Sequence, residues 1–270
     1  MTSAQTMLAI RRRRLGAVLA LAACAACLGA CEALAPKRPE LTPPPAPTAP
    51  YDASQGEVLW AVLPLRNESG TEIFDPLAVS DRLVAAAEEV EGIRTVPLNR
   101  TLQAMHALDI TAVRDPADVH RIADAMGVDG VIVGSITAYD PYDPPTIGLS
   151  LALYARTHAM SARRQEHAID PRALTSAPTD GPPDPRVADR DRPAAVASAH
   201  LDAKDHAVLA AIKAYAEGRH DPRSALGWKR YTASMDLYTQ FATQHLVSAL
   251  LAKEQRRLGA LAEVSDTPPP

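Results

Sequence analysis

The 270-residue sequence predicts an α/β fold: a central mixed sheet flanked by helices in a three-layer-like arrangement, with a long carboxy-terminal amphipathic helix packed on it. Three observations predict this. Short apolar runs alternate with helical patterns between residues 57 and 126, the order typical of α/β domains. Two strand-like runs, 129–139 and 146–155, then follow each other directly and indicate an antiparallel pair. A helical pattern over 224–257 carries four of the eleven aromatic side chains and is expected to cover the sheet.

The first half of the fold is marked by one buried strand and by two helix starts. Residues 57–65, EVLWAVLPL, are mostly apolar, as in a strand covered on both faces. Asp75 and Asp115 each stand before a proline, which places an N-cap residue ahead of proline at the first helical position. Between these two helices the sequence predicts a short strand, IRTVP at 93–97, and a short helix that begins at Leu98.

The next two strands differ in their patterns. Residues 129–139, DGVIVGSITAY, form an apolar run that predicts a buried strand after a helix stop at Gly127. Residues 146–155, TIGLSLALYA, alternate larger apolar side chains with smaller ones. This period of two predicts a strand with unequal faces.

The carboxy-terminal part is predicted to be helical. A helix is expected from His200 to Glu217, ended by Gly218, and a longer one from Ser224 to about Arg257. The aromatic face of the longer helix is expected to pack on the sheet, with His245 as a hydrogen-bonded core residue; a partner-binding helix is the alternative. The apolar positions are Leu201, Val208, Ile212 and Tyr215 in the first helix, and Trp228, Tyr231, Met235, Tyr238 and Phe241 in the second.

All three cysteines lie in one short segment, LAACAACLGACEA at 21–33. Four arginines at 11–14 precede an apolar run at 15–28, which is shorter than the roughly 20 residues of a membrane span but suits a signal peptide. The tetrad Leu28-Gly29-Ala30-Cys31 resembles the lipobox of bacterial lipoproteins, which implies cleavage after Ala30 and lipid on Cys31. The alternative is an ordinary signal peptide that leaves a free thiol. Glu32, where inner-membrane lipoproteins have Asp, favours the outer membrane.

This interpretation sets the expected domains and charge. Without residues 1–30 the chain has 24 basic and 32 acidic residues, a net charge of −8, which disfavours nucleic-acid binding. The proline-rich segment after Cys31 is expected to be an extended spacer. The predicted segments are a signal peptide (1–30), a Pro-rich linker (31–55), an α/β core (56–157), a Pro-rich polar insertion (158–198), a helical part packed on the core (199–258) and a disordered tail (259–270).

Two stretches of the core, VLPLRNESG at 62–70 and IADAMGVDGVIVGS at 122–135, resemble a periplasmic module. It is shared by the curli-secretion lipoprotein family (CsgG), the penicillin-binding-protein activator LpoB and the amino-terminal domain of TolB. The resemblance covers residues 56–156. It implies a non-enzymatic envelope protein in which Gly127 and Gly134 are turn and close-packing positions. The curli channel crosses its membrane with inserted hairpins, whereas the corresponding region here, 161–185, is polar and broken by proline, which argues against a pore.

No catalytic or metal-binding motif is complete. His200 and His206, with Asp202 and Asp205 between them, lack the spacing of three or four that ligands on one helix face need. Ser135 has only half of a nucleophile elbow. The expected function is therefore a lipid-anchored, outer-membrane protein, facing the periplasm, that binds other envelope proteins or itself. Neither a small-molecule substrate nor a cofactor beyond the lipid on Cys31 is expected. The alternatives are a subunit of a curli-like secretion assembly and, more remotely, a cryptic envelope hydrolase.

Overall fold

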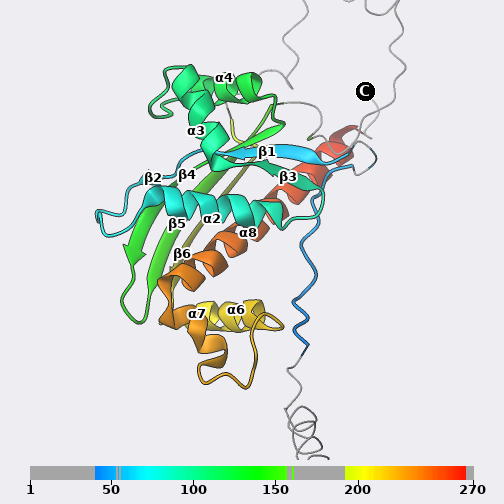
Figure 1. Ribbon diagram of the computed structural model, residues 1–270. Helices are drawn as coiled ribbons and strands as arrows, with labels where there is room; N and C mark the ends of the chain where they lie inside the picture. The colour runs from blue at the N-terminus through cyan, green and yellow to red at the C-terminus, as the bar shows by residue number, and fades with distance from the viewer. Residues whose placement is uncertain (1–39, 53, 55, 157–159, 161–191, 266–270) are drawn as a thin grey trace, which may run out of the picture. The chain divides into compact units, whose positions relative to one another are not determined.

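The computed structural model describes residues 40–52, 54, 56–156, 160 and 192–265. The chain divides into two units, Met1–Leu41 and Thr42–Pro270, and the fold described below is that of the second. Figure 1 shows an open sheet with helices on both of its faces.

The sheet has six strands and is mixed. Its order is β3-β1-β4-β5-β6, and β2 pairs with β4 beside that path. Pairing is parallel among β1, β2, β3 and β4, and antiparallel from β4 to β5 and from β5 to β6. The strands are β1 (Val58–Val62), β2 (Arg66–Asn67), β3 (Ile93–Val96), β4 (Gly130–Asp140), β5 (Thr146–Ala155) and β6 (Ala195–Asp202).

The helices form two layers. The helices α2 and α8 pack on one face, while α3 and α4 pack on the other face over β1 and β4 (Figure 1). The helices are α2 (Pro76–Glu88), α3 (Leu98–Ala107), α4 (Pro116–Met126), α6 (His206–Ala216), the 3-10 helix η3 (Gly227–Lys229), α7 (Arg230–Ala233) and α8 (Met235–Ser265). Across the described ranges, none of these helices combines the length and the apolar content that a membrane span requires.

The strand β1 shows how the two cores are divided. Val58, Trp60 and Val62 point to the α2 and α8 side, and Ala61 points to the α3 and α4 side, because successive side chains of a strand face opposite ways. All four are buried, which explains why this segment is apolar throughout.

The predicted fold class is confirmed, and so are the two proline-marked helix starts. Asp75 accepts a hydrogen bond from the Leu77 amide at the start of α2, and Asp115 accepts one from the Asp118 amide in α4. Each cap satisfies an amide that has no partner within its helix. The predicted antiparallel pairing of β4 with β5 is also confirmed.

The prediction of a helix from His200 is wrong in its first part. Residues 195–202 form β6, and the helix α6 begins only at His206, where the Asp205 carboxylate accepts a hydrogen bond from the Ala207 amide. The strand forms because it completes the sheet: Ser198 lies opposite Ser150 of β5, and their hydroxyls are 2.8 Å apart. The expected boundary between insertion and helical part at 198–199 therefore falls inside a strand.

The long carboxy-terminal helix also differs from its prediction. Instead of one helix from Ser224, the chain forms η3 and α7 and then breaks at Ser234, whose backbone is extended (φ −126°, ψ 116°). The helix α8 then continues to Ser265, beyond its predicted end near Arg257, so the first seven residues of the predicted disordered tail (259–270) are helical instead. Packing of its aromatic face is as predicted, since Tyr238 and Phe241 are fully or almost fully buried.

Candidate functional site

The residues predicted to carry the anchor, Leu28, Gly29, Ala30 and Cys31, lie outside the described residues, so their role stays a prediction. The two predicted glycine positions are described. Gly127 follows the last residue of α4 with φ 67°, the left-handed conformation that favours glycine. Gly134 lies on β4, where an added Cβ would overlap the Ser150 carbonyl oxygen and a side-chain methyl of Leu151.

The segment 42–51, which belongs to the predicted spacer, packs along the body of the protein. At its start, the Thr42 carbonyl lies against Gly218, just beyond α6, where no Cβ could fit. Farther along, a parallel bridge joins Thr48 to Glu91: the Ala49 amide donates to the Glu91 carbonyl at 2.8 Å, and the Glu91 amide donates to Pro47 at 2.9 Å. We call residues 42–51 the docked segment.

The docked segment ends in a buried polar network formed by Tyr51, Glu254 and Arg257. The Tyr51 hydroxyl donates to Glu254 Oε1 at 3.3 Å, and its ring meets the Trp60 ring edge-on, with centroids 6.2 Å apart. Arg257 donates to both carboxylate oxygens of Glu254, at 2.7 Å through Nε and at 2.6 Å through a terminal nitrogen. It also donates to the Met160 carbonyl at 3.1 Å. We call these three side chains the Glu254 network.

Because Glu254 is buried, this network holds the docked segment firmly to α8. The Glu254 side chain is 0% exposed, so its charge needs the guanidinium beside it. Hydrogen bonding to Glu254 is the main cause that raises the pKa of Arg257. Burial, followed by the Glu254 carboxylate, raises the pKa of Tyr51 well above its usual value, so the phenol remains a hydrogen-bond donor.

Sequence reasoning did not find the Glu254 network, but α8 carries one signal of it. Glu254 lies on the buried stripe of the helix, three and four residues after Leu251 and Leu250 and four before Leu258. An acid at such a position needs a buried partner. Tyr51 is 203 positions away in the chain, and no pattern in the sequence links it to α8.

Replacing Gly218 with alanine is expected to release the docked segment. The added Cβ would overlap the Thr42 carbonyl, and φ is 69°, so the variant meets both a clash and backbone strain. Proteinase K should then cleave between Thr42 and Tyr51 at least about 10-fold faster, since cleavage follows the population of the open form. Gly127→Ala is the matched control: its φ is 67° and nothing lies within 4 Å of the added Cβ. If the two variants are cleaved alike, the segment is not held at Gly218.

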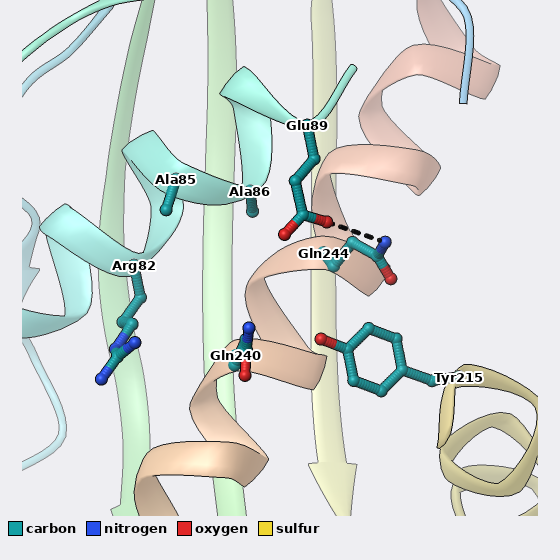
Figure 2. Close-up of a pocket in the computed structure, with 7 residues that line it drawn as sticks. All are labelled: Arg82, Ala85, Ala86, Glu89, Tyr215, Gln240 and Gln244. Atoms are coloured by element: carbon teal, nitrogen blue, oxygen red, sulfur yellow. Dashed lines mark hydrogen bonds between the residues drawn. The ribbon is translucent and has the colours of Figure 1, made fainter. Parts of the chain in front are cut away.

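Figure 2 shows a small polar hollow between α2, α6 and α8. It provides about 20 Å³, which is room for a water molecule and not for a metabolite. Gln244 donates to Glu89 across it at 3.4 Å, and burial raises the pKa of Tyr215 to about 12. The lining residues are Arg82, Ala85, Ala86, Glu89, Tyr215, Gln240 and Gln244. The hollow therefore has the character of a helix–helix contact.

The side chains considered for chemistry are not brought together. His200 is exposed on β6, whereas His206 starts α6. Within the described parts of the chain, no group of three or more His, Cys, Asp or Glu side chains could hold a metal ion. His245 is exposed on α8 beside the Phe241 ring, so its prediction as a core residue is wrong. Ser135 lies within β4, opposite Ser150 of β5.

No protein-family model and no curated protein matches the chain. Among solved structures, it is similar to the LpoB C-terminal domain from Salmonella enterica, with 14% identity and a TM-score of 0.32, over 37% of this chain and 73% of that one. It is also similar to lipoprotein GNA1162 from Neisseria meningitidis, with 18% identity and a TM-score of 0.30, over 54% and 80% of the two chains. A third similar structure is the hypothetical protein CT253 from Chlamydia trachomatis, with 10% identity and a TM-score of 0.37, over 74% of this chain and 98% of that one. These values assign the chain to no family.

Proposed function

We propose that this protein is a lipoprotein of the outer membrane, anchored through Cys31, whose α/β body binds other envelope proteins and catalyses no reaction. The observation that carries the proposal is the tetrad Leu28-Gly29-Ala30-Cys31 after a basic and then an apolar stretch, together with Glu32 as the next residue. A lipid on Cys31 would hold the body at the membrane, because acyl chains bind a bilayer in proportion to the number of buried methylenes.

The docked segment limits the length of free chain between a lipid on Cys31 and the α/β body. From Thr42 onward the chain is fastened to the body, at Gly218, at Glu91 and through the Glu254 network. The chain from Cys31 to Thr42 can span at most about 40 Å when fully extended. A lipid-anchored body would therefore stay within about that distance of the bilayer surface, where envelope partners can be reached by a short tether.

Removal of the acyl-accepting cysteine tests the anchor. We expect the chain from residue 31 with Cys31→Ala, exported behind an ordinary cleavable signal peptide, to move from the membrane fraction to the soluble periplasmic fraction. The native chain with Cys24→Ala or Cys27→Ala is the control, because these cysteines precede the cleavage site; both variants should remain at the membrane. Mass spectrometry of the native product should show acyl groups on Cys31. An unmodified amino terminus, or membrane retention of the Cys31→Ala chain, would refute the anchoring proposal.

A subunit of a curli-like secretion assembly is the second candidate, and the resemblance of residues 56–156 to that family favours it. In this case the detergent-solubilised protein should run as a ring and should conduct ions in planar bilayers. A protein that stays monomeric in every detergent and conducts no ions in planar bilayers would eliminate this candidate. The non-enzymatic binding function would then be the proposal that remains.

A further inference from the structure

An aromatic pair links the loop between β2 and α2 to the last residues of β4. Phe74, in the loop between β2 and α2, stacks on Tyr139 near the end of β4, with ring centroids 4.0 Å apart and planes 17° apart. The loop that follows Tyr139 connects β4 to β5. Both loops lie on the left in Figure 1. Three more large apolar residues lie close to the pair in the sequence, and we call the five residues Ile73, Phe74, Leu77, Tyr139 and Tyr142 the aromatic surface.

Three residues of the aromatic surface are exposed to solvent, while Phe74 and Tyr139 are half-buried and pack against the main core. Ile73 is 60% exposed, Leu77 is 40% exposed and Tyr142 is 76% exposed. Of the seven large apolar side chains that are exposed in the described part of the chain, these three lie within three residues of Phe74 or Tyr139 in the sequence. Exposed apolar residues that are scattered singly need no explanation, whereas a group of them marks an interaction site.

Local hydrogen bonds hold the two loops in place. The Asn67 amide donates to the Thr71 carbonyl at 2.7 Å, and its oxygen accepts from the Ser69 amide at 3.1 Å. In the other loop, the Asp140 carboxylate accepts from the Tyr142 amide at 3.1 Å. A surface that is ordered before binding loses less conformational entropy when a partner arrives.

The two loops are strongly acidic. Residues 68–75 and 139–146 contain Glu68, Glu72, Asp75, Asp140 and Asp143, and neither segment contains a lysine or an arginine. Arg66 lies next to the first segment and is partly neutralised by Glu68, whose carboxylate is 3.6 Å away.

A sixth carboxylate approaches from α8. Burial, and then the Asp236 carboxylate, raise the pKa of Tyr139, so Asp236 belongs to the surroundings of the stacked pair. Arg82, the one cation within α2, forms an ion pair with Asp236 at 2.5 Å, so these two charges offset each other. Because Arg66 and Arg82 offset two of the six carboxylates, the segments around the stacked pair keep an excess of four negative charges.

We propose that the aromatic surface binds a basic protein segment in which lysine or arginine side chains flank an apolar anchor; this inference rests on the proposed function and names the chemistry of its partner. Aromatic side chains and arginine dominate the energetics of protein interfaces, and a guanidinium gains further from lying over an aromatic face. The acidic residues would steer a basic partner and repel the anionic surface of a bilayer.

Site-specific photo-cross-linking in intact envelopes tests this proposal. The lipidated full-length chain carries a photoreactive phenylalanine derivative in place of Tyr142, and a second chain carries it in place of Leu226, which is 56% exposed far along the sequence. We expect a cross-linked product at position 142 and none at 226. The partner peptide joined to position 142 should contain lysine or arginine within a few residues of the cross-link.

Charge reversal distinguishes electrostatic attraction between the acidic residues and a basic partner from non-specific hydrophobic binding. Glu72→Lys together with Asp143→Lys should lower the cross-linking yield at least about 10-fold, because two attractive charges become repulsive. Glu217→Lys, an exposed acid at the end of α6, should leave the yield unchanged. Thermal melting monitors folding in every variant.

Four results would overturn the proposal: equal yields at 142 and 226, a yield insensitive to charge reversal, products with lipid, or products with a second copy of this chain. The Cys31→Ala fractionation is read separately. If the Cys31→Ala variant leaves the membrane fraction but no cross-link forms at position 142, the anchoring proposal stands and the binding role of the aromatic surface is rejected.

Discussion

Replacing Arg257 with methionine is expected to lower the free energy of unfolding by about 3–5 kcal/mol. The variant keeps the Glu254 carboxylate at a position that is 0% exposed but removes both charge-assisted hydrogen bonds to it. Only the 3.3 Å bond from Tyr51 would remain. A buried carboxylate without its counter-charge is among the most costly defects that a single substitution creates. Urea denaturation of the mature chain, followed by circular dichroism, measures the change.

The double variant Glu254→Met with Arg257→Met is the control for this prediction. Because it removes both charges and fills the site with flexible apolar side chains, its stability should return to within about 1 kcal/mol of the wild type. A single Arg257→Met variant that is as stable as the wild type would show that water reaches Glu254. The docked segment should also become more accessible to proteinase K in the double variant, since Tyr51 loses its acceptor there.

Much of the fold could be predicted because local signals and tertiary packing agree. Asp75 and Asp115 stand before prolines and do cap α2 and α4, and the apolar run at 129–139 is the buried strand β4. The strand β6 was missed for a physical reason. Its inward residues Ala195 and Ala197 are small, and alanine favours helix, so the alternation carried little signal. Pairing with β5 overrides that preference.

Less of the candidate site could be predicted. The predicted lipobox rests on a local motif, whereas the Glu254 network joins residues far apart in the chain. Glu254 stands in the charged sequence KEQRR, which is typical of a solvated helix face. Only the position of α8 on the sheet reveals that Glu254 points inward. The aromatic surface was missed for a similar reason, since Phe74 and Tyr139 are 65 residues apart and Asp-Pro pairs at 140–144 indicate no more than a turn.

Replacing Phe241 with alanine is expected to cost about 3–5 kcal/mol of unfolding free energy. Phe241 is 2% exposed, and its ring contacts the rings of Tyr215 of α6 and Tyr238 of α8, with centroids 5.6 and 5.9 Å away. Its removal leaves a cavity where α6 meets α8, in addition to the lost burial of apolar surface. Urea denaturation of the variant tests this value, and Tyr215 and Tyr238 report the change through their near-ultraviolet circular dichroism.

The chain contains only one other phenylalanine, and it provides the matched control. Phe74 is half-buried and contacts Tyr139 at the surface, so Phe74→Ala should cost about 1 kcal/mol, the worth of one aromatic pair. The same substitution should nevertheless lower the cross-linking yield at position 142, because the stacked pair forms the centre of the aromatic surface. If Phe74→Ala destabilises the protein as much as Phe241→Ala does, the pair belongs to the core and its exposure does not serve a partner. If Phe74→Ala lowers the cross-linking yield without a large loss of stability, Phe241 serves folding and Phe74 serves recognition of a partner.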